Sequence, residues 1–130
     1  MKVTVDTNVL VRVARADDDP AEAMVARRLL ESATRVAVPL SVLCEFDWVM
    51  RKSYQRPRAE VLASLRAIVA GPNVALDREA VAVGLAFLAA GGDFADGVIA
   101  YDGRRLGGEA FASFDAKAKR IAAASGFAVI

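Results

Sequence analysis

Short β-branched runs along the chain alternate with longer stretches whose apolar residues have a helical spacing. The first run places Val3 and Val5 on either side of Thr4 and ends at Asp6. A short apolar run closed by polar residues predicts a buried strand. Further short runs predict strands at 36–38, 74–76, 110–113 and 127–130.

Between these runs, apolar residues recur every three or four positions, which predicts amphipathic helices. The predicted helices span residues 9–14, 21–33, 40–52, 57–70, 78–90, 93–105 and 114–124. Asp19 precedes Pro20 and is the expected N-cap of the second helix, on which Met24, Leu29 and Leu30 are expected to face inward. Alternating strands and helices predict an α/β fold in which helices flank a central parallel sheet in three layers. With 130 residues, we expect a single domain over residues 1–130.

Composition narrows the class of protein. The chain is 55% hydrophobic and 25% charged, as in globular proteins. Charges interrupt every apolar run well before the length of a membrane span, and Asp6 argues against a secretory signal. Cys44 is the only cysteine, which fits a reducing cytoplasm. The net charge of +1 means that any contact with a polyanion must come from a local patch.

The chain contains no histidine. This excludes a Ser-His-Asp triad and histidine-based zinc sites. Any chemistry must therefore rest on carboxylates, hydroxyls, amides and cations, and carboxylate oxygens suit Mg²⁺ or Mn²⁺.

Acidic residues stand where predicted strands end or predicted helices begin. They are Asp6, Asp93, Asp96 and Asp115, and Glu45 lies near the start of its helix. In a parallel sheet these positions collect at one edge, where carboxylates would repel one another unless they held a cation. Asp6 and Asp93 are also in position to cap helices, and Asp96 stands in a first turn where negative charge is favourable. For these three residues the structural role therefore remains open beside the metal-binding one.

Four cations surround Tyr54: Arg51, Lys52, Arg56 and Arg58. An aromatic ring among cations is typical of a surface that binds single-stranded nucleic acid. Solvated surface charge, locally favourable near the end of a helix, is the other interpretation.

The chain resembles PIN-domain ribonucleases, specifically the VapC-type toxins of bacterial toxin–antitoxin systems. The resemblance covers nearly the whole chain and rests on the order of its motifs. These are Val-Asp-Thr-Asn-Val-Leu-Val-Arg at 5–12, Val-Pro-Leu-Ser-Val-Leu-Cys-Glu-Phe at 38–46, Asp-Phe-Ala-Asp at 93–96 and Ser-Phe-Asp at 113–115. Tyr101-Asp102-Gly103 departs from the more apolar helix that the family would lead us to expect.

The resemblance implies an endoribonuclease that hydrolyses RNA phosphodiester bonds with Mg²⁺ or Mn²⁺. It implies an acidic quartet of Asp6, Glu45, Asp96 and Asp115, with Asp93 as an accessory metal ligand. Supporting polar roles fall to Thr7, Asn8 and Ser113. Neither the number of metal ions nor the RNA target follows from the sequence.

The resemblance also implies a cytoplasmic homodimer inhibited by a VapB-like antitoxin. We expect an Arg or Lys of the antitoxin to enter the acidic cluster, because a cation would relieve its repulsion. An apolar groove for the antitoxin tail is expected along the helix carrying Leu43, Phe46 and Met50, or along the helix at 21–33.

The sequence also bears on three other interpretations. A non-catalytic PIN-like module that binds RNA or protein remains the alternative. A haloacid-dehalogenase-like phosphatase is disfavoured, because Asn8 stands where that family has a second Asp. A Rossmann cofactor site is disfavoured because no Gly-x-Gly-x-x-Gly follows the first strand.

Overall fold

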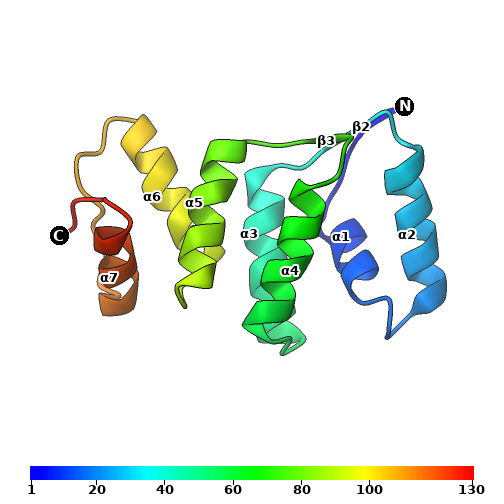
Figure 1. Cartoon of the computed structure of the whole chain (residues 1–130), viewed down its shortest axis with the longest axis horizontal. Coiled ribbons are helices and arrows are strands. Elements are labelled where there is room, and N and C mark those ends of the chain that lie inside the picture. Colours follow the sequence, from blue (N-terminus) through cyan, green and yellow to red (C-terminus); the bar gives the residue numbers. More distant parts are fainter.

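Three short parallel strands form the sheet in the computed structural model, which describes residues 1–130. They are β1 (Lys2–Thr4), β2 (Arg35–Ala37) and β3 (Val74–Ala75), in the spatial order β1-β2-β3. Val3 lies opposite Val36 in the register of β1 and β2. The strands lie beside α1 to α4 near the N-terminus, at one end of an elongated molecule (Figure 1).

Helices surround this sheet, and the predicted helices are confirmed to within a few residues. They are α1 (Thr7–Ala14), α2 (Pro20–Ser32), α3 (Leu40–Trp48), α4 (Arg58–Val69), α5 (Arg78–Ala89), α6 (Phe94–Arg105) and α7 (Ala116–Ala124). The end of the helix predicted at 40–52 is a π-helix, η1 (Val49–Ser53). The α/β fold with a parallel sheet flanked by helices is therefore confirmed. No helix combines the length and the apolar composition that crossing a membrane requires.

The predicted strands at 110–113 and 127–130 do not join this sheet. They pair only with each other, through a parallel bridge between Phe111 and Val129. Figure 1 places this C-terminal part and α7 at the end of the molecule opposite to β1–β3. The 110–113 segment contains two alanines and only one large apolar side chain, so it offers little surface to bury in a sheet.

Buried side chains form two clusters. The larger one has 15 residues, drawn from the strands and from α1, α3, η1, α4, α5 and α6. The smaller one contains Phe87, Ala100, Ile121, Ala122 and Phe127. Helices α5 and α6 contribute to both clusters, so they connect the sheet region to α7.

Of the three residues expected to face inward on α2, Leu30 packs against the larger core cluster, and the expectation for Met24 and Leu29 was wrong. Met24 is 54% exposed and Leu29 42% exposed, because α2 buries only its small residues Ala23 and Ala26. Conversely, the three residues expected to line a groove on α3 and η1, Leu43, Phe46 and Met50, are all 0% exposed. They belong to the larger core cluster and offer no surface to a partner.

Candidate functional site

The start of α6 carries the most perturbed carboxyl group of the candidate site. The pKa of Asp96 is raised, first because the carboxyl is partly buried and then because Asp93 and Asp115 place negative charge near it. Burial and like charge both disfavour the ionised form of an acid. The structure therefore brings together three of the predicted acids, Asp93, Asp96 and Asp115, which we call the acidic group.

Asp115 is held by the beginning of α7. Its Oδ1 accepts hydrogen bonds from the backbone N–H groups of Lys117 (2.9 Å) and Ala118 (3.2 Å). The Ser113 hydroxyl oxygen in turn accepts a bond from the Asp115 backbone N–H at 3.0 Å. Capping thus fixes one oxygen of Asp115 and leaves Oδ2 without a hydrogen bond.

Asp93 does not cap α6 with its side chain, although it occupies the N-cap position. Its Oδ1 instead accepts a hydrogen bond from Arg51 Nη2 at 2.7 Å. The backbone N–H of Phe94, in the first turn of α6, donates to Asp47 Oδ2 at 3.1 Å. The capping carboxylate therefore comes from α3, 47 positions earlier in the chain.

Asp47 and Arg51 form a two-point ion pair beneath the acidic group. Arg51 Nε lies 2.6 Å from Asp47 Oδ1, and Arg51 Nη2 lies 2.9 Å from Asp47 Oδ2. Asp47 is only 1% exposed, and the pKa of Arg51 is raised, chiefly by its hydrogen bond to Asp47. Asp47 was not among the predicted site residues, although it shares a helix face with Arg51 at i and i+4 and lies in an otherwise apolar stretch. This pair ties the end of α3 to the start of α6.

Close packing against α5 holds α6 from another side. A Cβ atom added to Gly97 would lie 2.6 Å from the Val83 carbonyl oxygen, and one added to Gly84 would lie 2.6 Å from the Phe94 ring. Only glycine permits such an approach of backbone and ring. Asp96 is thus carried by a helix whose position is fixed by both α3 and α5.

The polar residues after β1 lie in a different setting. Asp6 caps α1, its Oδ1 accepting from the backbone N–H of Val9 at 3.3 Å, and Thr7 is buried while Asn8 is exposed. Asp6 and Asn8 line one end of a groove of about 640 Å³ between α1 and α2.

Glu45 is exposed on α3. Neither Asp6 nor Glu45 forms a hydrogen bond with the acidic group, and no three acidic side chains lie where they could hold one metal ion together. The donors are of the type that Mg²⁺ and Mn²⁺ prefer, but no three of them form a ligand set for one ion.

The arginines around Tyr54 are engaged within the protein. Arg56 pairs with Asp17 and Asp18 (both 3.0 Å), and the bond from Arg56 is the main reason that the pKa of Asp17 is lowered. Arg58 donates to the carbonyl oxygens of Leu88 (2.9 Å) and Gly92. Together with Arg51, three of the four cations in this cluster have internal partners.

Tyr54 is also occupied, because the Arg15 guanidinium carbon lies 3.7 Å from the centre of its ring. The structure therefore disfavours the nucleic-acid interpretation of this cluster, and it shows internal contacts of Arg51, Arg56 and Arg58 where solvated charges were the other expectation.

Comparison with protein families identifies the PIN domain over residues 3–124. No curated protein and no solved structure matches the chain. The family match covers β1 from Val3 onward and all seven α-helices, and it includes Asp6 and the acidic group. The chain therefore belongs to the PIN domain family, whose fold is of the nuclease type.

Proposed function

We propose that this PIN-domain protein is a metal-dependent endoribonuclease that hydrolyses RNA phosphodiester bonds around Asp96. The observation that carries the proposal is the match of residues 3–124 to the PIN domain family, whose members are generally metal-dependent nucleases. The raised pKa of Asp96, caused by burial and by the charges of Asp93 and Asp115, supports this place for the reaction. Carboxyl groups with shifted pKa values cluster at functional sites, because catalysis and binding require arrangements of charge that lower the stability of the fold.

Other residues hold the starts of α6 and α7 in place, and so they keep the acidic side chains near one another. Asp47 and Arg51 anchor the first turn of α6, and Ser113 accepts a bond from the Asp115 backbone. Such positioning of repelling carboxylates is useful where a cation binds. A bound divalent ion would stabilise the charge that develops on a phosphate during hydrolysis.

We assign the remaining polar residues roles from their motif positions. Asp6 and Glu45 complete the acidic quartet, and Thr7 and Asn8 support Asp6. Because no three acids form a ligand set, we assign no reaction step to an ion held by particular oxygens. Mg²⁺ and Mn²⁺ are the ions that this all-oxygen donor set fits best.

The proposal extends to a toxin–antitoxin pair acting in the cytoplasm as a VapC-like homodimer with a VapB-like antitoxin. Support comes from the groove between α1 and α2, where Val25 and Leu29 form an apolar lining close to Asp6. An amphipathic partner segment that lies in this groove would bring an Arg or Lys to the carboxylate at its end.

The decisive experiment is RNA cleavage by Asp96→Asn, with Asp102→Asn on the same helix as the matched control. The substitution keeps the shape of Asp96 and removes its charge, and we expect a loss on the order of 100-fold or more. The wild type should cleave with Mg²⁺ or Mn²⁺ and not after chelation. Cleavage by the wild type that survives chelation, or full activity of Asp96→Asn, would contradict the mechanism.

The second candidate function is a non-catalytic PIN-like module that binds RNA or protein. It is favoured by the lack of three acids placed to hold an ion. Under this alternative, the protein would bind RNA but leave it intact at any metal concentration.

A further inference from the structure

Phe114 lies on the surface next to the acidic group. It is fully exposed, at 111% of its reference area, and it stands between Ser113 and Asp115. A single exposed apolar residue needs no explanation by itself. Two cations on α7, close to Phe114 in the sequence, suggest a role for the exposed ring.

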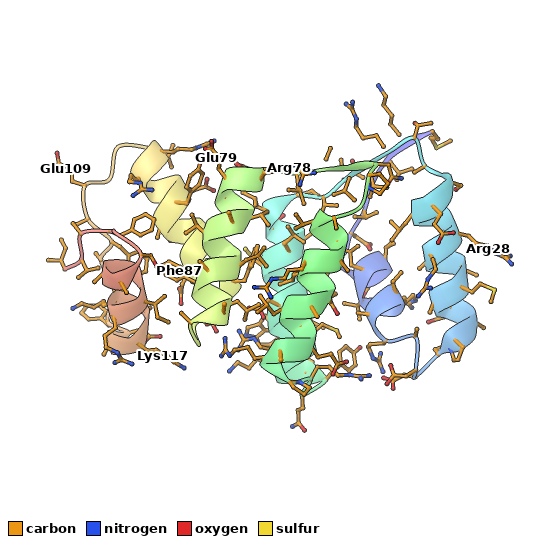
Figure 2. The ribbon with its side chains drawn as sticks, in the orientation of Figure 1. Arg28, Arg78, Glu79, Phe87, Glu109 and Lys117 are labelled. Atoms are coloured by element: carbon orange, nitrogen blue, oxygen red, sulfur yellow. The ribbon has the colours of Figure 1, made fainter.

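Lys117 and Arg120 are three residues apart and therefore share one face of α7. Both are exposed, and neither side chain forms an ion pair, in contrast to Arg51 and Arg56. They line a hollow of about 280 Å³ that also includes Ala90 at the end of α5. Figure 2 shows Lys117 at the lower end of α7, with the C-terminal part of the molecule around it.

The side chain of Lys117 reaches toward the turn that precedes α6. A Cβ atom added to Gly91 would lie 3.8 Å from Lys117 Cε, and Gly91 is two positions before Asp93. The hollow with its two cations is therefore adjacent to the acidic group.

From these neighbours we propose that Phe114, Lys117 and Arg120, here called the α7 patch, bind a single-stranded segment of RNA beside the acidic group. Lys117 and Arg120 contact phosphates in the hollow, and Phe114 stacks on an unpaired base. This inference rests on the proposed nuclease function and adds the surface that positions its substrate.

Charge and reach favour RNA as the occupant. Two unpaired cations complement a phosphate backbone, and an exposed aromatic ring beside them gives a base a stacking surface, which together are the features of single-strand binding. Three residues span at most about 11 Å, so one strand can contact Phe114 and Lys117 together. An acidic protein segment would satisfy the cations but would not require the ring.

The first test measures binding of a fluorescent 12-nucleotide single-stranded RNA to the full chain in chelator, where no metal-dependent cleavage occurs. For Lys117→Gln with Arg120→Gln we expect weaker binding and a salt dependence whose logarithmic slope is smaller by about 1.4, since each phosphate contact contributes about 0.7. Arg27→Gln with Arg28→Gln is the charge-matched control. Both arginines are exposed on α2 and form no ion pair, and Figure 2 shows Arg28 at the opposite end of the molecule.

The second test separates stacking from charge. Phe114→Ala should weaken binding by about 5- to 150-fold, the range for loss of one base–aromatic stack, and Phe114→Trp should preserve it. On an abasic strand of the same length and charge, Phe114→Ala should bind as the wild type does. Because the ring is fully exposed, melting curves of the variants should match that of the wild type.

The outcomes distinguish this inference from the proposed function. If the wild type cleaves RNA with metal while the α7 variants bind and cleave equally well, the patch is wrong and the nuclease stands. If the wild type neither binds nor cleaves RNA, both fail. Equal competition by an acidic peptide, with no effect of Phe114→Ala, would show a protein-binding surface and overturn RNA as the occupant.

Discussion

Arg51 in η1, Arg56 just before α4 and Arg58 at the start of α4 form one group of cations, and Lys117 and Arg120 on α7 form another. In the sequence, the first group is typical of a surface that binds nucleic acid. In the structure, each of its three arginines donates to a carboxylate or a backbone carbonyl of the same chain. The sequence did not single out the second group as a binding surface. In the structure, its two side chains form no ion pair within the protein.

The difference shows that a cluster of positive residues has no fixed role. The role of each cation depends on whether oxygen atoms from distant elements lie within hydrogen-bonding distance of it. Around Arg51, two helices supply carboxylates at 2.6–2.9 Å, so the cation becomes part of the architecture. Around Lys117, the adjacent turn exposes glycine and alanine, and the charge remains available to a ligand.

The largest effect on stability is expected for Asp47→Ala. The substitution leaves Arg51 buried with only Asp93 as a partner and removes the acceptor for the Phe94 N–H, and breaking a buried pair costs about 3–5 kcal/mol. Urea unfolding measures this loss. Glu22→Gln, which breaks the exposed pair with Arg12, is the control and should change stability by less than about 1 kcal/mol.

The Asp47 variant has an independent readout in Cys44. Burial, followed by the charges of Asp47 and Asp102, raises the pKa of this thiol to about 11. Removing Asp47 should therefore lower the pKa of Cys44 and speed its alkylation at alkaline pH. An unchanged alkylation rate in a folded variant would mean that the charge of Asp47 is not felt across α3.

An intermediate effect is expected for Arg58→Gln. Its guanidinium donates to two carbonyl oxygens near the end of α5, and bonds from a charged group contribute about 1.5–3 kcal/mol. Denaturant unfolding should show this loss while binding to single-stranded RNA stays at the wild-type level. Weaker RNA binding by a folded Arg58→Gln protein would restore the nucleic-acid interpretation of the first group.

A smaller effect, opposite in sign, is expected for Asp96→Asn. The folded pKa of Asp96 is raised above an unfolded value of about 3.9. The wild type therefore loses stability as pH rises from the unfolded pKa of Asp96 to its raised folded pKa. Asn removes the repulsion, so melting temperature should rise at neutral pH, and the gain should disappear below about pH 4. A gain that persists in acid would locate the strain elsewhere.

The smallest effect is expected for Lys117→Gln with Arg120→Gln. Surface substitutions away from specific contacts change stability by no more than about 0.5 kcal/mol. Unfolding in urea should overlay that of the wild type. A clear destabilisation would mean that these cations have an architectural role like that of Arg51, and the contrast between the two groups would fail.

The sequence by itself determined the features that depend on neighbours along the chain. Asp19 caps α2 with Pro20 in its first turn, as predicted, because a cap joins residues two or three positions apart. The helix boundaries follow for the same reason, since periodicity and capping residues are local. The acids at the starts of α6 and α7 could be located in the same way.

Tertiary structure alone decided which of these local features meet. Asp47 reaches the Phe94 N–H, and Arg51 reaches Asp93 across 42 positions, because α3 packs against α6. Residues 110–113 pair with 127–130 outside the sheet of β1–β3, and the charge of Asp115 is close enough to Asp96 to raise its pKa. Such contacts depend on which apolar helix faces pack against each other. The sequence cannot distinguish among helix faces of similar composition, so it does not predict which helices come into contact.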